Sequence, residues 1–189
     1  NTAGKDFEVA IECHTRWNLP SALKIAKDLE PYDVMWIEDI LGEDNMDSYA
    51  TLCRDTSSTI AVSERLATKF RFREVLERKA ADIIILDIAW CGGISEAKKI
   101  VDMADAYYIP FATHNFGGPL LWVSSIHLGT AAKNCFITES SWEMYNNVFP
   151  YFIKNVPKVV DGFVTPLEGP GLGVEFNDEP FKNGDAVVE

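Results

Sequence analysis

The sequence lacks a long uninterrupted apolar run. Its most apolar stretch, IIILDIAW, is interrupted by Asp87 and is much shorter than the ~20 residues that a membrane-spanning helix needs. The opening residues, NTAGKDFE, do not contain the apolar segment of a secretion signal. We therefore expect neither membrane insertion nor export, and we expect a cytoplasmic protein.

Cysteine is scarce, and its spacing excludes the usual frameworks. The sequence contains four cysteines, none of them in a CxxC pair, and each lies within or beside an apolar segment: Cys13, Cys53, Cys91 and Cys135. This pattern favours reduced, buried thiols over a set of disulfide bonds. Such thiols are typical of the cytoplasm.

Positive charge is also in deficit. The chain has 17 Lys and Arg residues against 29 Asp and Glu residues, a formal net charge of −12, and the basic residues are scattered. A protein that binds nucleic acid or an anionic membrane usually carries a clustered basic patch. We therefore expect neither kind of partner.

What the sequence does contain is an alternation of short apolar segments with longer amphipathic ones. The predicted strands cover residues 8–12, 34–38, 59–64, 82–87, 109–113 and 135–139. The first predicted helix begins at Pro20 and Ser21. The other predicted helices cover residues 44–54, 69–78, 95–105 and 120–132. Because most of these strands are too apolar for one exposed face, they indicate a parallel sheet covered by helices, an α/β fold.

The length of 189 residues and the hydrophobic content of 47% suffice for one core, so we expect a single domain over residues 1–189. Strand-helix units fill residues 1–145. Residues 146–189 are rich in proline, glycine and aromatic residues, which predicts an irregular tail that covers part of the body.

A glutamate ends each of the first three predicted strands. Glu12, Glu38 and Glu64 follow one another at intervals of 26 residues, from 12 to 38 and from 38 to 64. If consecutive strands are neighbours at equal depth, these carboxylates converge at the carboxyl ends of the strands, where parallel sheets hold their sites. Converging anions need a cation between them, and oxygen ligands favour Mg²⁺. Any single one of these glutamates is equally well explained as facing water or capping a helix.

Ionisable residues also follow the last three predicted strands: Asp87, His114 and Glu139. A histidine beside an aspartate on the next strand is a base whose tautomer the carboxylate sets, so Asp87 and His114 form a candidate proton-transfer dyad. His14 lies two residues beyond Glu12, and in an extended chain both side chains face the same way. We expect His14 to act as a proton donor beside the glutamates, with loop capping as the alternative.

Two other features have simpler explanations. The tryptophans Trp17, Trp36 and Trp122 are expected to be packing residues. The stretch CGGIS, residues 91–95, stands at a predicted helix start, where its backbone N–H groups would suit an anion and its glycines would suit a tight turn equally well.

Six motifs taken together resemble the barrel domain of the enolase superfamily, in the mandelate racemase and muconate lactonizing enzyme group: WIED, VSERL, ILDIAWCGGI, FATHNFGGPL, FITE and GPGLGVEF. The resemblance implies an incomplete TIM-type barrel, made of strands three to eight of a (β/α)8 or (β/α)7β barrel. It further implies that an amino-terminal capping domain and the first two strands are missing from the sequence. We therefore expect a fragment of a longer protein that forms homo-oligomers.

The resemblance implies a role for each candidate site residue. The Mg²⁺ ligands would be Glu12, Glu38 and Glu64. His114, backed by Asp87, would be the general base, and Glu139 would help to bind the substrate carboxylate or its enolate. The family usually has aspartate where Glu12 stands, and the extra methylene adds ~1.5 Å of reach, which makes Glu12 the departure from the family pattern.

Within this group, an acid followed two residues later by His14 is similar to acid-sugar dehydratases such as galactonate and gluconate dehydratase. There the histidine would protonate the departing 3-hydroxyl. The implied reaction removes the proton α to a carboxylate of a small sugar acid and then expels water, giving a 2-keto-3-deoxy acid. Two alternatives stay open: a racemase or epimerase of a 2-hydroxy acid or similar carboxylate, which needs a second base, and a catalytically inactive barrel.

Overall fold

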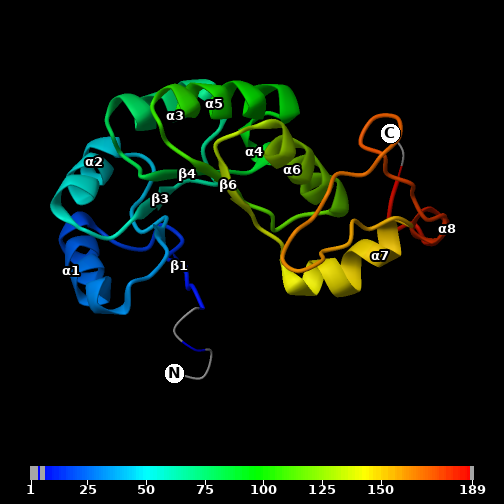
Figure 1. The fold of residues 1–189 in the computed structure, drawn as a ribbon, viewed down its shortest axis with the longest axis horizontal. Helices are drawn as coiled ribbons and strands as arrows, with labels where there is room; N and C mark the ends of the chain where they lie inside the picture. Colours follow the sequence, from blue (N-terminus) through cyan, green and yellow to red (C-terminus); the bar gives the residue numbers. More distant parts are fainter. Residues whose placement is uncertain (1–3, 5–6, 188–189) are drawn as a thin grey trace.

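A computed structural model describes residue 4 and residues 7–187 of the chain. Its centre is a curled sheet of six parallel strands in sequence order, with helices along the outer side (Figure 1). The strands are β1 Ile11–Glu12, β2 Ile37–Glu38, β3 Ile60–Val62, β4 Ile83–Leu86, β5 Phe111–Thr113 and β6 Cys135–Thr138. The predicted α/β class and the incomplete TIM-type barrel are thereby confirmed.

The helices that follow the strands occupy the segments predicted to be helical. They are α1 Leu19–Leu29, α2 Met46–Asp55, α3 Thr68–Glu77, α5 Ile94–Ala106 and α6 Pro119–Ala131, with a short 3-10 helix at Glu30–Tyr32. Asparagine side chains begin two of them, because Asn18 accepts a hydrogen bond from Ser21 N and Asn45 accepts one from Ser48 N. Each helix thus starts soon after a strand ends.

The central strands β3, β4 and β5 are buried on both faces, as their apolar sequences indicate, whereas Phe136 and Ile137 of the edge strand β6 are exposed. Successive side chains of a strand point to opposite faces. In β4, Ile84 and Leu86 belong to the core beneath the helices, whereas Ile83 and Ile85 belong to a smaller cluster on the other face. We call this second group the inner cluster; its buried members are Trp36, Ala61, Ile83, Ile85 and Ala112. Each fully buried aliphatic side chain contributes roughly 1.5–3 kcal/mol to folding.

A short helix between β4 and α5 was not predicted. It is α4, Ile88–Cys91, and Asp87 begins it by accepting a hydrogen bond from Trp90 N at 3.0 Å. The helix ends at Gly92, whose φ is 119°, and Gly93 follows with a φ of 88°. L-residues with side chains rarely adopt these angles, so the two glycines are explained by a tight turn between α4 and α5.

The segment after β6 contains short helices as well as irregular chain: a π-helix at Met144–Val148, then α7 Phe149–Phe152 and α8 Glu179–Asn183. Its part around Phe149, Val156 and Val164 packs against α6. Its anchor is Phe149, which packs on Trp122 of α6 with ring centroids 5.7 Å apart. Figure 1 shows α7 and α8 on the far side of α6 from β1.

Within the described residues, β1 pairs only with β2 and β6 only with β5, so the sheet does not close on itself. The side chains of Trp36 and Phe136, near its two edges, meet edge to face with ring centroids 6.2 Å apart. Among the residues that the structure describes, no helix is both long and apolar enough to span a bilayer.

Candidate metal and catalytic site

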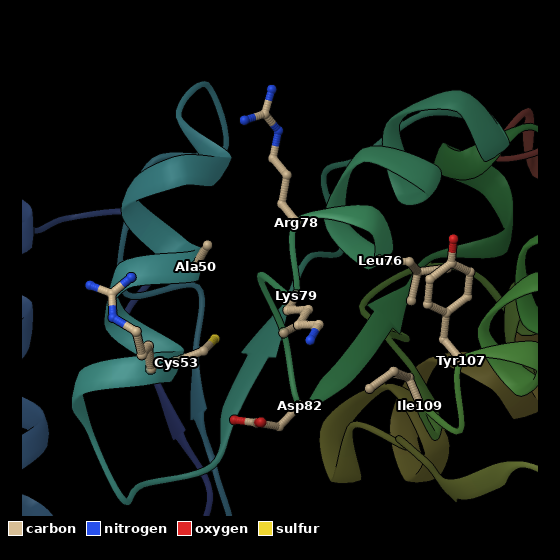
Figure 2. Close-up of a pocket in the computed structure, with 10 residues that line it drawn as sticks. Ala50, Cys53, Leu76, Arg78, Lys79, Asp82, Tyr107 and Ile109 are labelled. Atoms are coloured by element: carbon tan, nitrogen blue, oxygen red, sulfur yellow. The ribbon is translucent and has the colours of Figure 1, made fainter.

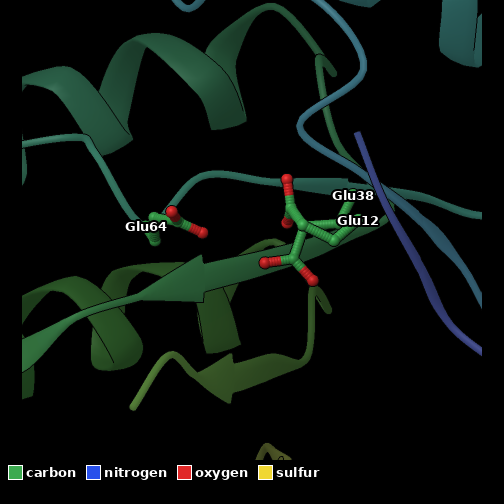
Figure 3. Close-up of side chains that lie close together, drawn as sticks. All are labelled: Glu12, Glu38 and Glu64. Atoms are coloured by element: carbon green, nitrogen blue, oxygen red, sulfur yellow. The ribbon is translucent and has the colours of Figure 1, made fainter. Parts of the chain in front are cut away.

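The carboxyl ends of the first strands bring the three predicted metal ligands together. Glu12 ends β1 and Glu38 ends β2, and the two residues are register partners. Glu12, Glu38 and Glu64 each offer a carboxylate oxygen, and these oxygens lie within 4.8 Å of one another. Figure 3 shows the three side chains converging on one space. We call these residues the glutamate cluster.

The expectation of equal depth is wrong for Glu64. The register partner of Glu38 on β3 is Ala61, so Glu64 lies three residues farther along the chain, beyond the end of the strand at Val62. Glu64 reaches the cluster from the turn that follows β3. The equal intervals of 26 residues therefore do not mean equal depth in the sheet. Only Glu12 and Glu38 are register partners.

Burial is the main influence on the pKa of two of these carboxyls. It raises the pKa of Glu38 to about 9; the hydrogen bond from Trp36 opposes this, and the charge of Glu12 adds to it. Burial also raises the pKa of Glu12. Burial thus favours the protonated form of Glu38, whereas a divalent cation would favour the ionised form. Three carboxylates without a thiolate are the ligands that suit Mg²⁺, so the residues fit this ion.

His114 and Asp87 form a hydrogen-bonded pair beside the cluster. Nδ1 of His114 lies 2.9 Å from Oδ2 of Asp87, and Nε2 lies 3.9 Å from Oε2 of Glu64. Desolvation lowers the pKa of His114, but the hydrogen bond to Asp87 and the charges of Glu64 and Glu139 outweigh it, so the net shift is upward. The pair therefore has the geometry of an oriented base.

His14 also lies beside the cluster, though not for the predicted reason. The chain leaves the extended conformation after Glu12, because His14 and Thr15 have φ angles of 50° and 60°. This turn lets the backbone N–H of His14 donate to the Glu12 carboxylate. It places Nδ1 of His14 3.8 Å from Oε1 of Glu12 and 3.7 Å from Oε1 of Glu64. The His14 side chain is 55% exposed, so it can exchange protons with solvent.

Glu139 follows β6 and lies on the same side as His114. Its backbone N–H donates to Thr113 O at 3.3 Å, and its Oε2 accepts from Asn115 N at 2.5 Å. Glu139 is exposed, and its charge contributes to the raised pKa of His114. The carboxylate is therefore available at the rim of the site.

Two further residues beside the cluster were not expected to take part in it. Trp36 is buried, as expected of a packing residue, but its indole N–H also donates to Oε2 of Glu38 at 2.9 Å. Asp39 is fully buried, and Oδ2 accepts from Ser63 Oγ at 2.8 Å. Burial raises the pKa of Asp39 to about 8, with smaller contributions from Glu64 and Glu12. The position of Trp36, two residues before a ligand on the same strand face, was the available signal.

Residues 1–180 of the chain match the family described as enolase C-terminal domain-like. The chain belongs to this family. A D-xylonate dehydratase from Haloferax volcanii is 35% identical over 175 residues, which cover 92% of this chain and 42% of the relative. A D-galactonate dehydratase from Pectobacterium atrosepticum is 35% identical over 181 residues, which cover 93% of this chain and 47% of the relative.

Solved structures of enolase superfamily members have the same fold. An enolase of the mandelate racemase subgroup from Agrobacterium tumefaciens superposes with a TM-score of 0.88 at 36% identity. The match covers 95% of this chain and 48% of that one. The present chain therefore spans about half the length of the proteins that it matches.

A separate hollow of about 650 Å³ lies at the opposite end of the strands (Figure 2). It lies between α2 and α3, and its lining includes Asp82 and Ile109, which come just before β4 and β5. Its arginines already have acidic partners, because Arg54 binds Asp55 and Arg78 binds Asp47. None of the glutamate cluster lines it, so this hollow is distinct from the candidate site.

Proposed function

We propose that the whole protein is a Mg²⁺-dependent acid-sugar dehydratase. The relatives named D-xylonate dehydratase and D-galactonate dehydratase support this class of reaction. The observation that carries the proposal is that Glu64 lies between two imidazoles. Nδ1 of His14 is 3.7 Å from Oε1 of Glu64, and Nε2 of His114 is 3.9 Å from Oε2. An elimination needs both a base for the C–H bond and an acid for the leaving hydroxyl, and two histidines beside one ligand can supply both.

The glutamate cluster would hold the cation through its carboxylate oxygens. Magnesium bound there would stabilise the negative charge that develops on the substrate carboxylate as the neighbouring C–H bond breaks. Glu139, exposed at the rim, would hydrogen-bond to the same end of the substrate when either partner carries a proton.

His114 would take the proton α to the carboxylate at Nε2. Oδ2 of Asp87 would accept a hydrogen bond from Nδ1–H of His114. This favours the tautomer that leaves Nε2 free to accept a proton. The electrons of the broken C–H bond would be delocalised onto the substrate carboxylate as an enolate. The raised pKa of His114 means that the ring holds the proton well once it has accepted it.

His14 would donate a proton to the departing 3-hydroxyl. The electron pair of the enolate moves to form the C2=C3 double bond as the bond between C3 and oxygen breaks. The pair of that broken bond stays on the oxygen, which leaves as water after taking the proton. The resulting enol becomes a 2-keto-3-deoxy acid by tautomerisation. Because His14 is 55% exposed, solvent can restore its proton before the next turnover.

A substrate screen tests the proposal. The full-length protein with Mg²⁺ is incubated with a panel of aldonic and related sugar acids that includes D-xylonate and D-galactonate, and 2-keto-3-deoxy acids are detected by their semicarbazones. We expect turnover of at least one acid and its loss when Mg²⁺ is chelated. Change of configuration at C2 without any keto acid would replace the proposal with a racemase, and failure to bind Mg²⁺ would favour an inactive barrel.

A further inference from the structure

Trp36 lies two residues before Glu38, immediately before β2. Residues two apart on an extended strand point to the same face, so both side chains lie on the inner face of the sheet. Trp36 is 7% exposed and belongs to the inner cluster with Ala61 and Ile83. Its ring also meets Phe136 edge to face, with centroids 6.2 Å apart. The indole ring is therefore held from several sides.

The polar edge of this ring is directed at Glu38. Nε1 of Trp36 donates a hydrogen bond to Oε2 of Glu38 at 2.9 Å. An indole N–H can only donate, and a buried one needs an acceptor. A carboxyl oxygen accepts this hydrogen bond in the protonated and in the ionised form, so the contact satisfies the indole and at the same time restricts rotation of the Glu38 side chain.

The other members of the glutamate cluster are held differently. The Glu12 side chain is 42% exposed and accepts from the backbone of His14, while Glu64 enters from a turn. Glu38 is the member that a rigid, buried side chain orients. Partners of this kind fix the direction of a metal ligand before the ion arrives and thereby reduce the entropy lost on binding.

We propose that Trp36 is a positioning residue, whose indole N–H orients the Glu38 carboxylate for the cation. The proposal rests on the function proposed above, because it assumes that Glu38 is a ligand. It assigns to Trp36 a role beyond packing, which a phenylalanine at this position would preserve only in part. Phenylalanine keeps an aromatic ring in the inner cluster and lacks the N–H donor.

Isothermal titration of the full-length, metal-free protein with Mg²⁺ tests the proposal. We expect Trp36→Phe to weaken Mg²⁺ binding by roughly 10- to 100-fold. Trp122→Phe is the matched control, because Trp122 is also buried but packs against Phe149, outside the glutamate cluster. It should leave Mg²⁺ affinity unchanged. Unfolding midpoints of both variants in metal-free buffer show whether lost packing accounts for the effect.

A double-mutant cycle separates orientation from packing. Glu38→Asp shortens the side chain by ~1.5 Å and withdraws the carboxylate from the indole. In that background, Trp36→Phe should weaken Mg²⁺ binding much less than it does beside Glu38. Equal losses in the two backgrounds, or equal affinity of the wild type and Trp36→Phe, would overturn the role of Trp36 alone. If the wild type itself does not bind Mg²⁺, the metal site fails and the inference fails with it.

Discussion

The imidazole of His114 and the carboxylate of Asp87 meet because two neighbouring strands end in register. Leu86 of β4 pairs with Thr113 of β5, and each functional residue follows its strand directly. The backbone N–H of His114 donates to Leu86 O at 2.9 Å, which continues the sheet to the point where the side chains meet. Asp87 also begins α4 through Oδ1, so Oδ2 remains for the histidine. The carboxylate of Asp87 therefore serves both the start of α4 and the pair with His114.

Replacing His114 should remove the base. We expect His114→Asn to lower kcat by about 10²- to 10⁴-fold, the usual contribution of general acid-base catalysis. Mg²⁺ affinity should change little, because the three proposed ligands remain. Turnover of the best sugar acid and calorimetry with Mg²⁺ measure the two effects. Dehydration at the wild-type rate would show that another group takes the α proton.

Replacing Asp87 should impair the same step without disturbing the fold. Asn is also a good residue before a helix, so in Asp87→Asn the Oδ1 atom can still accept from Trp90 N. The amide lacks the negative charge that orients His114, and we expect kcat to fall by about 10²-fold or more. Thermal unfolding should be unchanged. A fall in stability as large as that of a core substitution would point to a mainly structural role.

Replacing His14 should separate the two halves of the reaction. His14 has a φ of 50°, and asparagine tolerates this conformation better than most residues. In His14→Asn, formation of the keto acid should fall by about 10²-fold or more while exchange of the α proton in D₂O continues. His114→Asn should lose both activities. Loss of exchange in His14→Asn would assign the α proton to His14 instead.

Much of this site was predictable because strand ends are local features. Short apolar strands, each with an ionisable residue at or just after its end, place Glu12, Glu38 and His114 at the carboxyl ends of a parallel sheet. The depth of Glu64 was not predictable, because it depends on the turn after β3. The turn at His14 and the hydrogen bond of Trp36 arise from φ angles and side-chain geometry, which residue spacing does not determine.

Glu64 is the proposed ligand that lies beside both histidines, and removing its charge should weaken Mg²⁺ binding. Glu64→Gln keeps the shape of the side chain but removes a negative charge from the glutamate cluster. We expect Mg²⁺ affinity to fall by at least about tenfold, because amide oxygens bind this ion less strongly than carboxylates. Titration calorimetry measures the loss. Glu77→Gln, at an exposed position near the end of α3, is the control and should bind Mg²⁺ as the wild type does.

Tyr49 should stabilise the loop that follows Glu38. Its hydroxyl is fully buried, donates to Leu41 O at 2.6 Å and accepts from Leu41 N at 3.1 Å. Tyr49→Phe would leave both backbone groups of Leu41 without this partner, which costs about 1–3 kcal/mol of unfolding free energy. Tyr32→Phe is the control, because Tyr32 is 75% exposed and should change stability by less than about 0.5 kcal/mol. Urea unfolding of the full-length protein measures both; equal effects would show that the hydroxyl of Tyr49 contributes no more than an exposed one.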